Sequence, residues 1–199
     1  MQKKFNKCFQ VGFNKTATSS LNAMFQRAGL KSAHWNSGHL AHMIETNHKY
    51  RRPLLSGITG YDCYTDVDYF VTDCNPMKRY FRELDEQYPE SIFIFNTRNV
   101  SDWIQSRFNQ GLHRMLYNQY MISGKEIVAK IWENQFQTHA RNLREYFKDN
   151  PDFIEFDIDS ETDKLYDFLQ KRGIENVELP LVNTTKNKNE KINNRFRSI

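Results

Sequence analysis

The sequence predicts an α/β domain in which a mostly parallel β-sheet is flanked by helices. Strand-like segments alternate along the chain with helical segments, which is the order that a parallel sheet requires. Residues 91–97, SIFIFNT, form a nearly continuous apolar run that is typical of a strand buried on both faces. With 199 residues and an aromatic content of 14%, the chain is long and apolar enough to build one hydrophobic core.

Strands and helices alternate in the first half of the chain. We expect strands over residues 7–13, 30–35 and 68–72, and helices over residues 19–29, 38–48 and 76–88. Gly29 stands where a helix commonly ends. Asn75 can cap the third helix, with Pro76 in its first position. Residues 49–65 are marked by Gly and Pro and predict an irregular connection.

The same alternation continues in the second half. We expect strands over residues 91–97 and 152–158, and helices over residues 101–111, 125–149 and 160–173. Ser101 and Ser160 are candidate caps for two of these helices. The helix over 125–149 is amphipathic, with its apolar residues on one side.

Excess positive charge is concentrated at the C-terminal end. The formal net charge is +4, with 28 basic and 24 acidic residues. Residues 184–199 contain five basic residues and one acid, so the remainder is balanced at 23 of each. We expect a single domain over residues 1–183 and a basic tail over 184–199. This tail is either a solvated extension or a segment that folds over a bound phosphate.

Several classes of protein are disfavoured by composition. The longest apolar run is too short for a membrane helix, and no signal peptide is expected. The three cysteines are odd in number and lack metal-site spacing, which favours reduced thiols in a cytoplasmic protein and no metal site. We expect neither a nucleic-acid partner nor a membrane span.

The segment from Gly12 to Ser20 joins the first strand to the first helix and predicts an anion site. Ligands of parallel sheets bind at the carboxyl ends of the strands, and the N-terminus of a helix attracts anions. We expect Gly12 to let the backbone turn sharply, while Lys15 adds a positive charge. Small and hydroxyl residues surround the lysine and can approach or donate to an anion, namely Thr16, Ala17, Thr18, Ser19 and Ser20.

This loop does not match the ATP-binding P-loop. That motif is G-x-x-x-x-G-K-[ST], whereas here only Phe13 and Asn14 separate Gly12 from Lys15. The second Gly is also missing. A magnesium–ATP site is therefore disfavoured, and an ordinary strand-to-helix turn remains the alternative.

Four segments together resemble sulfotransferases that use 3′-phosphoadenosine 5′-phosphosulfate (PAPS). The segment GFNKTATSSL resembles their 5′-phosphosulfate loop, and SIFIFNTRNVSDWIQS resembles their 3′-phosphate motif, with Arg98 and Ser106 eight residues apart. The segments DYFVTDCNP and LYDFLQKRGIENVELPLVNTT are similar to a subgroup of the family. The resemblance covers roughly residues 5–186 and implies a three-layer P-loop-like fold.

The resemblance also implies a cofactor and its binding residues. PAPS is the expected donor and PAP the product, bound by Gly12, Asn14, Lys15, Thr16, Ala17, Thr18, Ser19, Ser20, Arg98 and Ser106. The chain has Ala17 where many relatives carry Gly, and it lacks the C-terminal Arg–Lys–Gly segment of the cytosolic enzymes. Lys186 is a candidate to close over the nucleotide instead.

The catalytic residues are less determined by the sequence. Lys15 is expected to bridge the leaving phosphate and the sulfuryl group, and Asp73 is the preferred base, with His34 as the runner-up. Asp73 could instead cap a helix, and His34 could be a half-buried polar residue. The acceptor is a small molecule, a glycan or a peptide, and the oligomeric state is not predicted. An ATP-dependent kinase and a non-catalytic nucleotide-binding relative are the alternative functions.

Overall fold

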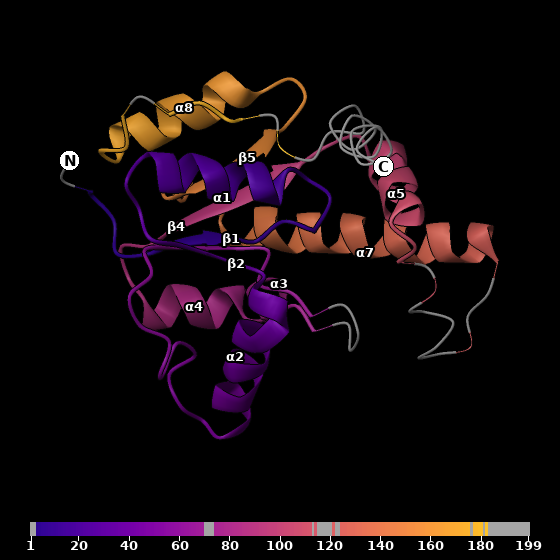
Figure 1. Cartoon of the computed structure of the whole chain (residues 1–199), viewed down its shortest axis with the longest axis horizontal. Coiled ribbons are helices and arrows are strands. Elements are labelled where there is room, and N and C mark those ends of the chain that lie inside the picture. The colour runs from indigo at the N-terminus through magenta and orange to yellow at the C-terminus, as the bar shows by residue number, and fades with distance from the viewer. Residues whose placement is uncertain are drawn as a thin grey trace, which may run out of the picture.

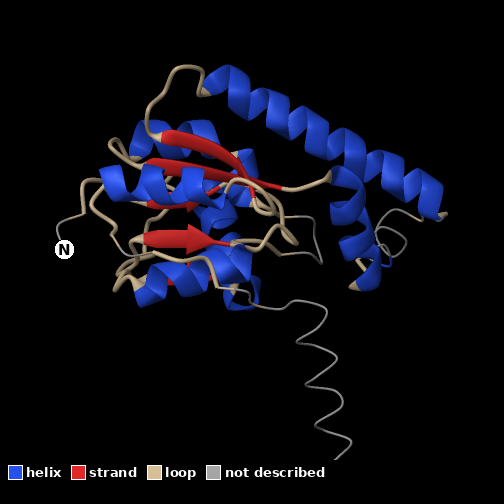
Figure 2. Cartoon of the chain, turned by 90° about the horizontal axis from the view of Figure 1, so that it is seen from above, coloured by secondary structure: helices blue, strands red, loops and turns tan. Residues whose placement is uncertain are grey.

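The computed structural model of the chain describes residues 3–69, 74–112, 114, 121, 124–175, 177–180 and 182. Helices cover both faces of a central five-stranded sheet (Figures 1 and 2). The strands are β1 (Cys8–Gln10), β2 (Ser32–His34), β3 (Cys63–Thr65), β4 (Ile92–Thr97) and β5 (Phe153–Asp157). The helices are α1 (Thr18–Arg27), α2 (His39–Lys49), α3 (Pro76–Arg79), α4 (Phe81–Gln87), α5 (Val100–Asn109), α7 (Lys125–Tyr146) and α8 (Thr162–Lys171), with a 3₁₀ turn at Asn36–Gly38.

The sheet has the strand order β2-β3-β1-β4-β5, and every neighbouring pair is parallel. Cys8 of β1 lies opposite Cys63 of β3 on one side and Ile92 of β4 on the other. Helices α1 and α8 lie over one face, and α2, α4 and α7 lie over the other (Figure 1). The predicted α/β class and its flanking helices are therefore confirmed.

The third strand differs from the prediction. The sheet uses Cys63–Thr65, inside the segment expected to be irregular, and Tyr69 forms only an antiparallel bridge with Cys74. All three residues of β3 are buried, because the strand lies inside the sheet between β1 and β2 and helices cover both of its faces. The prediction of a strand over 68–72 is thus wrong at residues 68 and 69, which belong to no strand of the sheet. Residues 70–73 lie outside the described part.

Two helix caps also differ from the prediction, whereas one is confirmed. Asn75 caps α3 by accepting a hydrogen bond from the main-chain N–H of Lys78 at 3.1 Å. Helix α5 is capped by Asn99, whose Oδ1 accepts from two first-turn N–H groups, so Ser101 is not the cap. Ser160 does not cap α8, because its hydroxyl donates to Asp157 instead.

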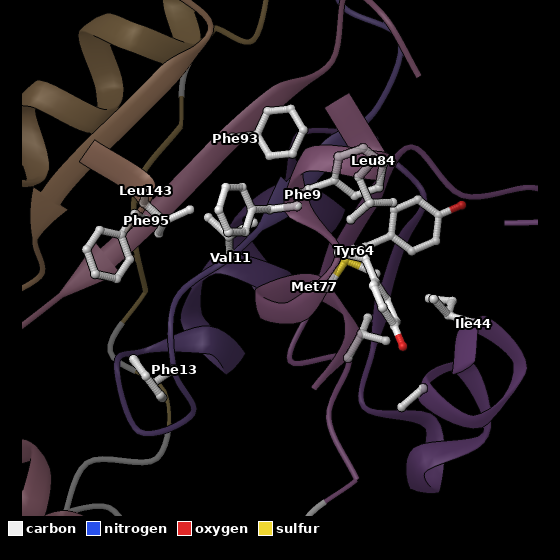
Figure 3. Packing of buried hydrophobic residues seen from close by; sticks show 14 of the residues in the cluster. Phe9, Val11, Phe13, Ile44, Tyr64, Met77, Leu84, Phe93, Phe95 and Leu143 are labelled. Atoms are coloured by element: carbon white, nitrogen blue, oxygen red, sulfur yellow. The ribbon is translucent and has the colours of Figure 1, made fainter. Parts of the chain in front are cut away.

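The two faces of the sheet bury different kinds of side chain. Phe9, Phe93 and Phe95 point toward the face covered by α4 and α7, where they meet Leu84 and Leu143 (Figure 3). The alternate positions Cys8, Ile92 and Ile94 point toward α1 and α8. Each fully buried large apolar side chain contributes roughly 1.5 to 3 kcal/mol to folding. The alternation fixes the register of the strands, since a slip of one residue would exchange the two faces.

Two further observations concern the chain as a whole. Cys8, Cys63 and Cys74 are buried and free. Of the helices in the described ranges, none combines the length and apolar character that a membrane crossing requires.

Candidate active site at the carboxyl edge of the sheet

The parallel strands all end at the same edge of the sheet, and several of the predicted site residues lie there. Arg98 directly follows β4, and His34 is the last residue of β2. The loop from Val11 to Ala17 leaves β1 and enters α1. This edge is where α/β sheets bind their ligands.

The loop bends at Gly12 and then passes through two left-handed residues, Lys15 and Ala17. Lys15 has a φ of 68° and Ala17 a φ of 61°, both in the left-handed region, while Gly12 does not have a positive φ. The role of Gly12 is close approach: a Cβ placed there would lie 2.7 Å from the main-chain oxygen of Asn96 and would also collide with Asn96 Oδ1. The chain does bend at Gly12, as expected, and the position requires glycine because of this close approach and not because of a left-handed backbone.

Ala17→Gly is expected to stabilise the protein by about 0.5 to 1 kcal/mol. A left-handed conformation costs a non-glycine residue roughly 1–2 kcal/mol, which outweighs the greater chain entropy that glycine loses on folding. Urea unfolding measures the change. Ala28→Gly is the matched control, because Ala28 has a φ of −75° and gains nothing from glycine. A variant Ala17→Gly that is less stable than wild type would show that the entropy lost by glycine outweighs the left-handed strain.

Two predicted binding residues hold the shape of the loop with their side chains. Asn14 is buried; its Nδ2 donates to Asp68 at 3.2 Å, and its Oδ1 accepts from Arg107 at 3.1 Å. Thr16 is fully buried and its hydroxyl donates to the main-chain oxygen of Phe13. The loop is consequently rigid, and its main-chain N–H groups remain the part that can face an anion.

A chain of buried amides, here called the amide relay, crosses the sheet beneath the loop. The N–H of Asp66 donates to Gln10 Oε1 at 2.9 Å, and Gln10 Nε2 donates to Asn96 Oδ1 at 2.7 Å. Asn96 Nδ2 in turn donates to the oxygen of Thr16. Gln10 and Asn96 were not predicted as site residues, although a polar residue inside an apolar strand was the available signal. A fully satisfied polar network of this kind rigidifies the surrounding structure.

Arg98 lies beside the loop, and not all of its guanidinium N–H groups are used in hydrogen bonds to described residues. Its NH1 donates to the main-chain oxygen of Lys15 at 3.4 Å, and its NH2 is 3.7 Å from Asp159. Its Nε is buried and has no hydrogen-bond partner within the described residues. Ser106 lies half-buried on α5, the helix that follows Arg98. An arginine in this position can bind an anion through a charge-assisted contact.

The remaining loop residues lie at the start of α1. Thr18 is buried, and Ser19 Oγ is 3.3 Å from His34 Nε2. Ser20 Oγ accepts from the N–H of Val182 at 3.3 Å, which ties the segment after α8 to this helix. Asp73 and Lys186 lie outside the described residues, so their predicted roles stay predictions.

His34 is held as a neutral ring with one nitrogen facing the site. Thr65 Oγ1 donates to the oxygen of Ala33, so it accepts a hydrogen bond from His34 Nδ1–H at 3.0 Å. The other nitrogen, Nε2, is then an acceptor. Burial lowers the pKa of His34, although a hydrogen bond to Thr65 acts in the opposite direction.

Asp66 and Asp68, which the sequence analysis did not identify, follow β3 at the same edge. Burial raises the pKa of Asp66 to about 7, and the charge of Asp68 adds to this rise. Lys78, Lys15 and a hydrogen bond from Thr18 lower it in part. Asp66 therefore titrates near neutral pH within reach of the charge of Lys15. No group of three His, Cys, Asp or Glu side chains in the described ranges could hold a metal ion.

Comparison with known proteins agrees with this geometry. A family model described as a sulfotransferase domain matches residues 7–122, which include the loop, His34, Asp66, Arg98 and Ser106. A search of curated proteins finds no match.

Proposed function

We propose that this chain, which belongs to the sulfotransferase domain family, transfers a sulfuryl group from PAPS to a hydroxyl group and releases PAP. The observation that supports PAPS most directly is the position of Arg98. Its guanidinium touches the loop through the oxygen of Lys15, and its buried Nε has no partner in the described part of the chain. PAPS carries two anionic groups, the 5′-phosphosulfate and the 3′-phosphate. A helix N-terminus can bind the first, and an arginine beside it can bind the second.

The first turn of α1 would hold the 5′-phosphosulfate. This helix has ten residues, no acidic residue in its first turn and no side-chain cap among the described residues. Its first N–H groups therefore lack the partners that a cap would supply, and they carry the partial positive charge of the helix dipole. The 3′-phosphate would be bound by Arg98 and by the hydroxyl of Ser106.

Lys15 would act on the leaving group. In sulfuryl transfer the acceptor oxygen bonds to sulfur, and the bond between sulfur and the bridging oxygen breaks. Negative charge consequently grows on the 5′-phosphate, and an ammonium group beside that oxygen lowers the barrier more than it strengthens ground-state binding. The half-buried position of Lys15 in the loop suits this role.

Calorimetry with PAP, AMP and ATP tests the proposal. We expect PAP to bind at least about tenfold more tightly than AMP, because the additional phosphate gains a charge-assisted contact worth about 1.5 to 3 kcal/mol. PAP release from PAPS is then measured with p-nitrophenol, a monosaccharide and a tyrosine peptide as acceptors. Equal affinities for PAP and AMP would contradict the 3′-phosphate site. Magnesium-dependent ATP turnover would favour a kinase instead.

A further inference from the structure

We infer that Asp66 is the catalytic carboxylate that takes the proton from the acceptor hydroxyl. The inference rests on the proposed sulfuryl transfer and names the base for it. The sequence had favoured Asp73 for this role because a strand was expected to end there. The strand that reaches the site ends at Thr65, so Asp66 occupies the position that had been assigned to Asp73.

The backbone holds Asp66 in a conformation that it would not adopt freely. Its φ is 49°, in the left-handed region. Its N–H is tied to Gln10 by the amide relay, and the preceding Thr65 is bound to both Ala33 and His34. Strained backbone that is fixed from several sides is concentrated at functional sites. The strain here places one side chain at the carboxyl edge.

The two carboxylate oxygens of Asp66 have different surroundings. Oδ2 lies 3.9 Å from His34 Nε2. Oδ1 is buried and accepts no hydrogen bond from any residue that the structure describes. A buried acceptor without a donor is costly, which disfavours the ionised form of Asp66 in the free protein. With 14% of its side chain exposed, Asp66 is still open to a ligand.

The charges around Asp66 suit a base that works near neutral pH. Burial and the nearby Asp68 favour the protonated form, while Lys15 and Lys78 favour the carboxylate. The resulting pKa of about 7 leaves the carboxylate populated and gives it a higher proton affinity than an ordinary Asp. The His34 ring lies beside this carboxylate, with its Nε2 3.9 Å from Asp66 Oδ2.

The chemical step is balanced by these groups. The acceptor oxygen forms a bond to sulfur as its proton moves to the carboxylate of Asp66. The bond between sulfur and the bridging oxygen breaks, and its electron pair stays on the 5′-phosphate of PAP beside Lys15. No oxidant, reductant or further reactant is needed.

Asp66→Asn keeps the shape of the side chain and removes the base. On the fastest acceptor of the panel above, we expect kcat to fall by about 10² to 10⁴, while the Kd for PAP changes less than about threefold. The wild-type rate should decline below a pKa near 7, and the variant should lose this acidic limb. Asp68→Asn should move the limb to lower pH, because it removes the neighbouring negative charge.

Asp62→Asn is the matched control. Asp62 directly precedes β3 at the opposite edge of the sheet, where it pairs with Lys3. This variant should keep the wild-type kcat, Kd and pH profile. A second measurement needs no acceptor: bound PAP is anionic and raises the pKa of Asp66, so wild type and Asp62→Asn should take up a fraction of a proton at pH 7.5. Calorimetry in two buffers of different ionisation enthalpy measures this uptake, which Asp66→Asn should lose.

The outcomes separate the inference from the proposed function. If Asp66→Asn keeps at least half of the wild-type kcat, or takes up as many protons as wild type, Asp66 is not the base and sulfuryl transfer still stands. If PAP affinity falls in step with kcat, Asp66 is structural and the inference is also overturned. A wild-type protein that does not bind PAP overturns both.

Discussion

Arg98→Ala is expected to weaken PAP binding by about 2 to 4 kcal/mol, because the change removes a partly buried, charge-assisted and bidentate-capable contact. The side chain is 24% exposed and its Nε is buried without a partner in the described residues, so little water competes for the phosphate. AMP lacks the 3′-phosphate and should lose much less affinity. Calorimetry with both nucleotides measures the difference.

Arg144→Ala provides the control for this experiment. Arg144 forms a two-point ion pair with Glu155, at 2.7 and 2.6 Å, on α7 and β5. The variant also loses an arginine ion pair, but this pair is not among the residues proposed to bind PAP. PAP affinity should therefore stay at the wild-type value. An equal loss of AMP and PAP affinity in Arg98→Ala would instead indicate that Arg98 supports the loop through the oxygen of Lys15. The melting temperature of the variant separates unfolding from lost binding.

Gly12→Ala is expected to lower the free energy of unfolding by about 3 kcal/mol or more and to abolish PAP binding. The added methyl group would lie 2.7 Å from the main-chain oxygen of Asn96, which belongs to the central strand β4 and cannot move aside. Overpacking of a well-filled site typically costs about 1–3 kcal/mol. The same methyl group would also displace Asn96 Oδ1 from Gln10, which breaks the amide relay.

Urea unfolding tests this prediction, with Gly29→Ala as the comparison. Gly29 has a φ of 78° and nothing within 4 Å of an added Cβ, so its variant reports backbone strain alone. That strain amounts to roughly 1–2 kcal/mol. Gly12 has no positive φ, so its variant carries no such strain and its whole loss reflects the collision with Asn96. If Gly12→Ala is no less stable than Gly29→Ala, the close approach of β1 and β4 at this point is not required.

Local patterns were sufficient to predict most of the fold. The run at residues 91–97 became β4, because every residue from Ile92 to Asn96 is buried between two helical layers. The pair Asn75 and Pro76 began a helix as their capping chemistry requires. The loop and Arg98 were also brought together as the resemblance implied.

β3 could not be predicted in the same way. The segment Cys63–Thr65 is only three residues long, and its burial comes from its place inside the sheet beneath the helices on both faces, not from its own pattern. The segment 68–72 has the stronger β propensity, but propensity is overridden by such tertiary context. Because the strand was misplaced, Asp66 was overlooked and Asp73 was favoured. The cap of α5 was missed for a simpler reason: Asn99 and Ser101 are both good caps, and only the geometry distinguishes them.

The amide relay constrains how related chains can vary in sequence. A main-chain N–H at Asp66 and a main-chain oxygen at Thr16 fix the direction of every hydrogen bond between them. A glutamate in place of Gln10 would set two acceptors against each other, and turning the Asn96 amide would only move that conflict to Thr16. The two positions must therefore evolve together or remain unchanged. We therefore expect a glutamine on β1 to occur together with an asparagine on β4 in chains that keep this hydrogen-bond chain.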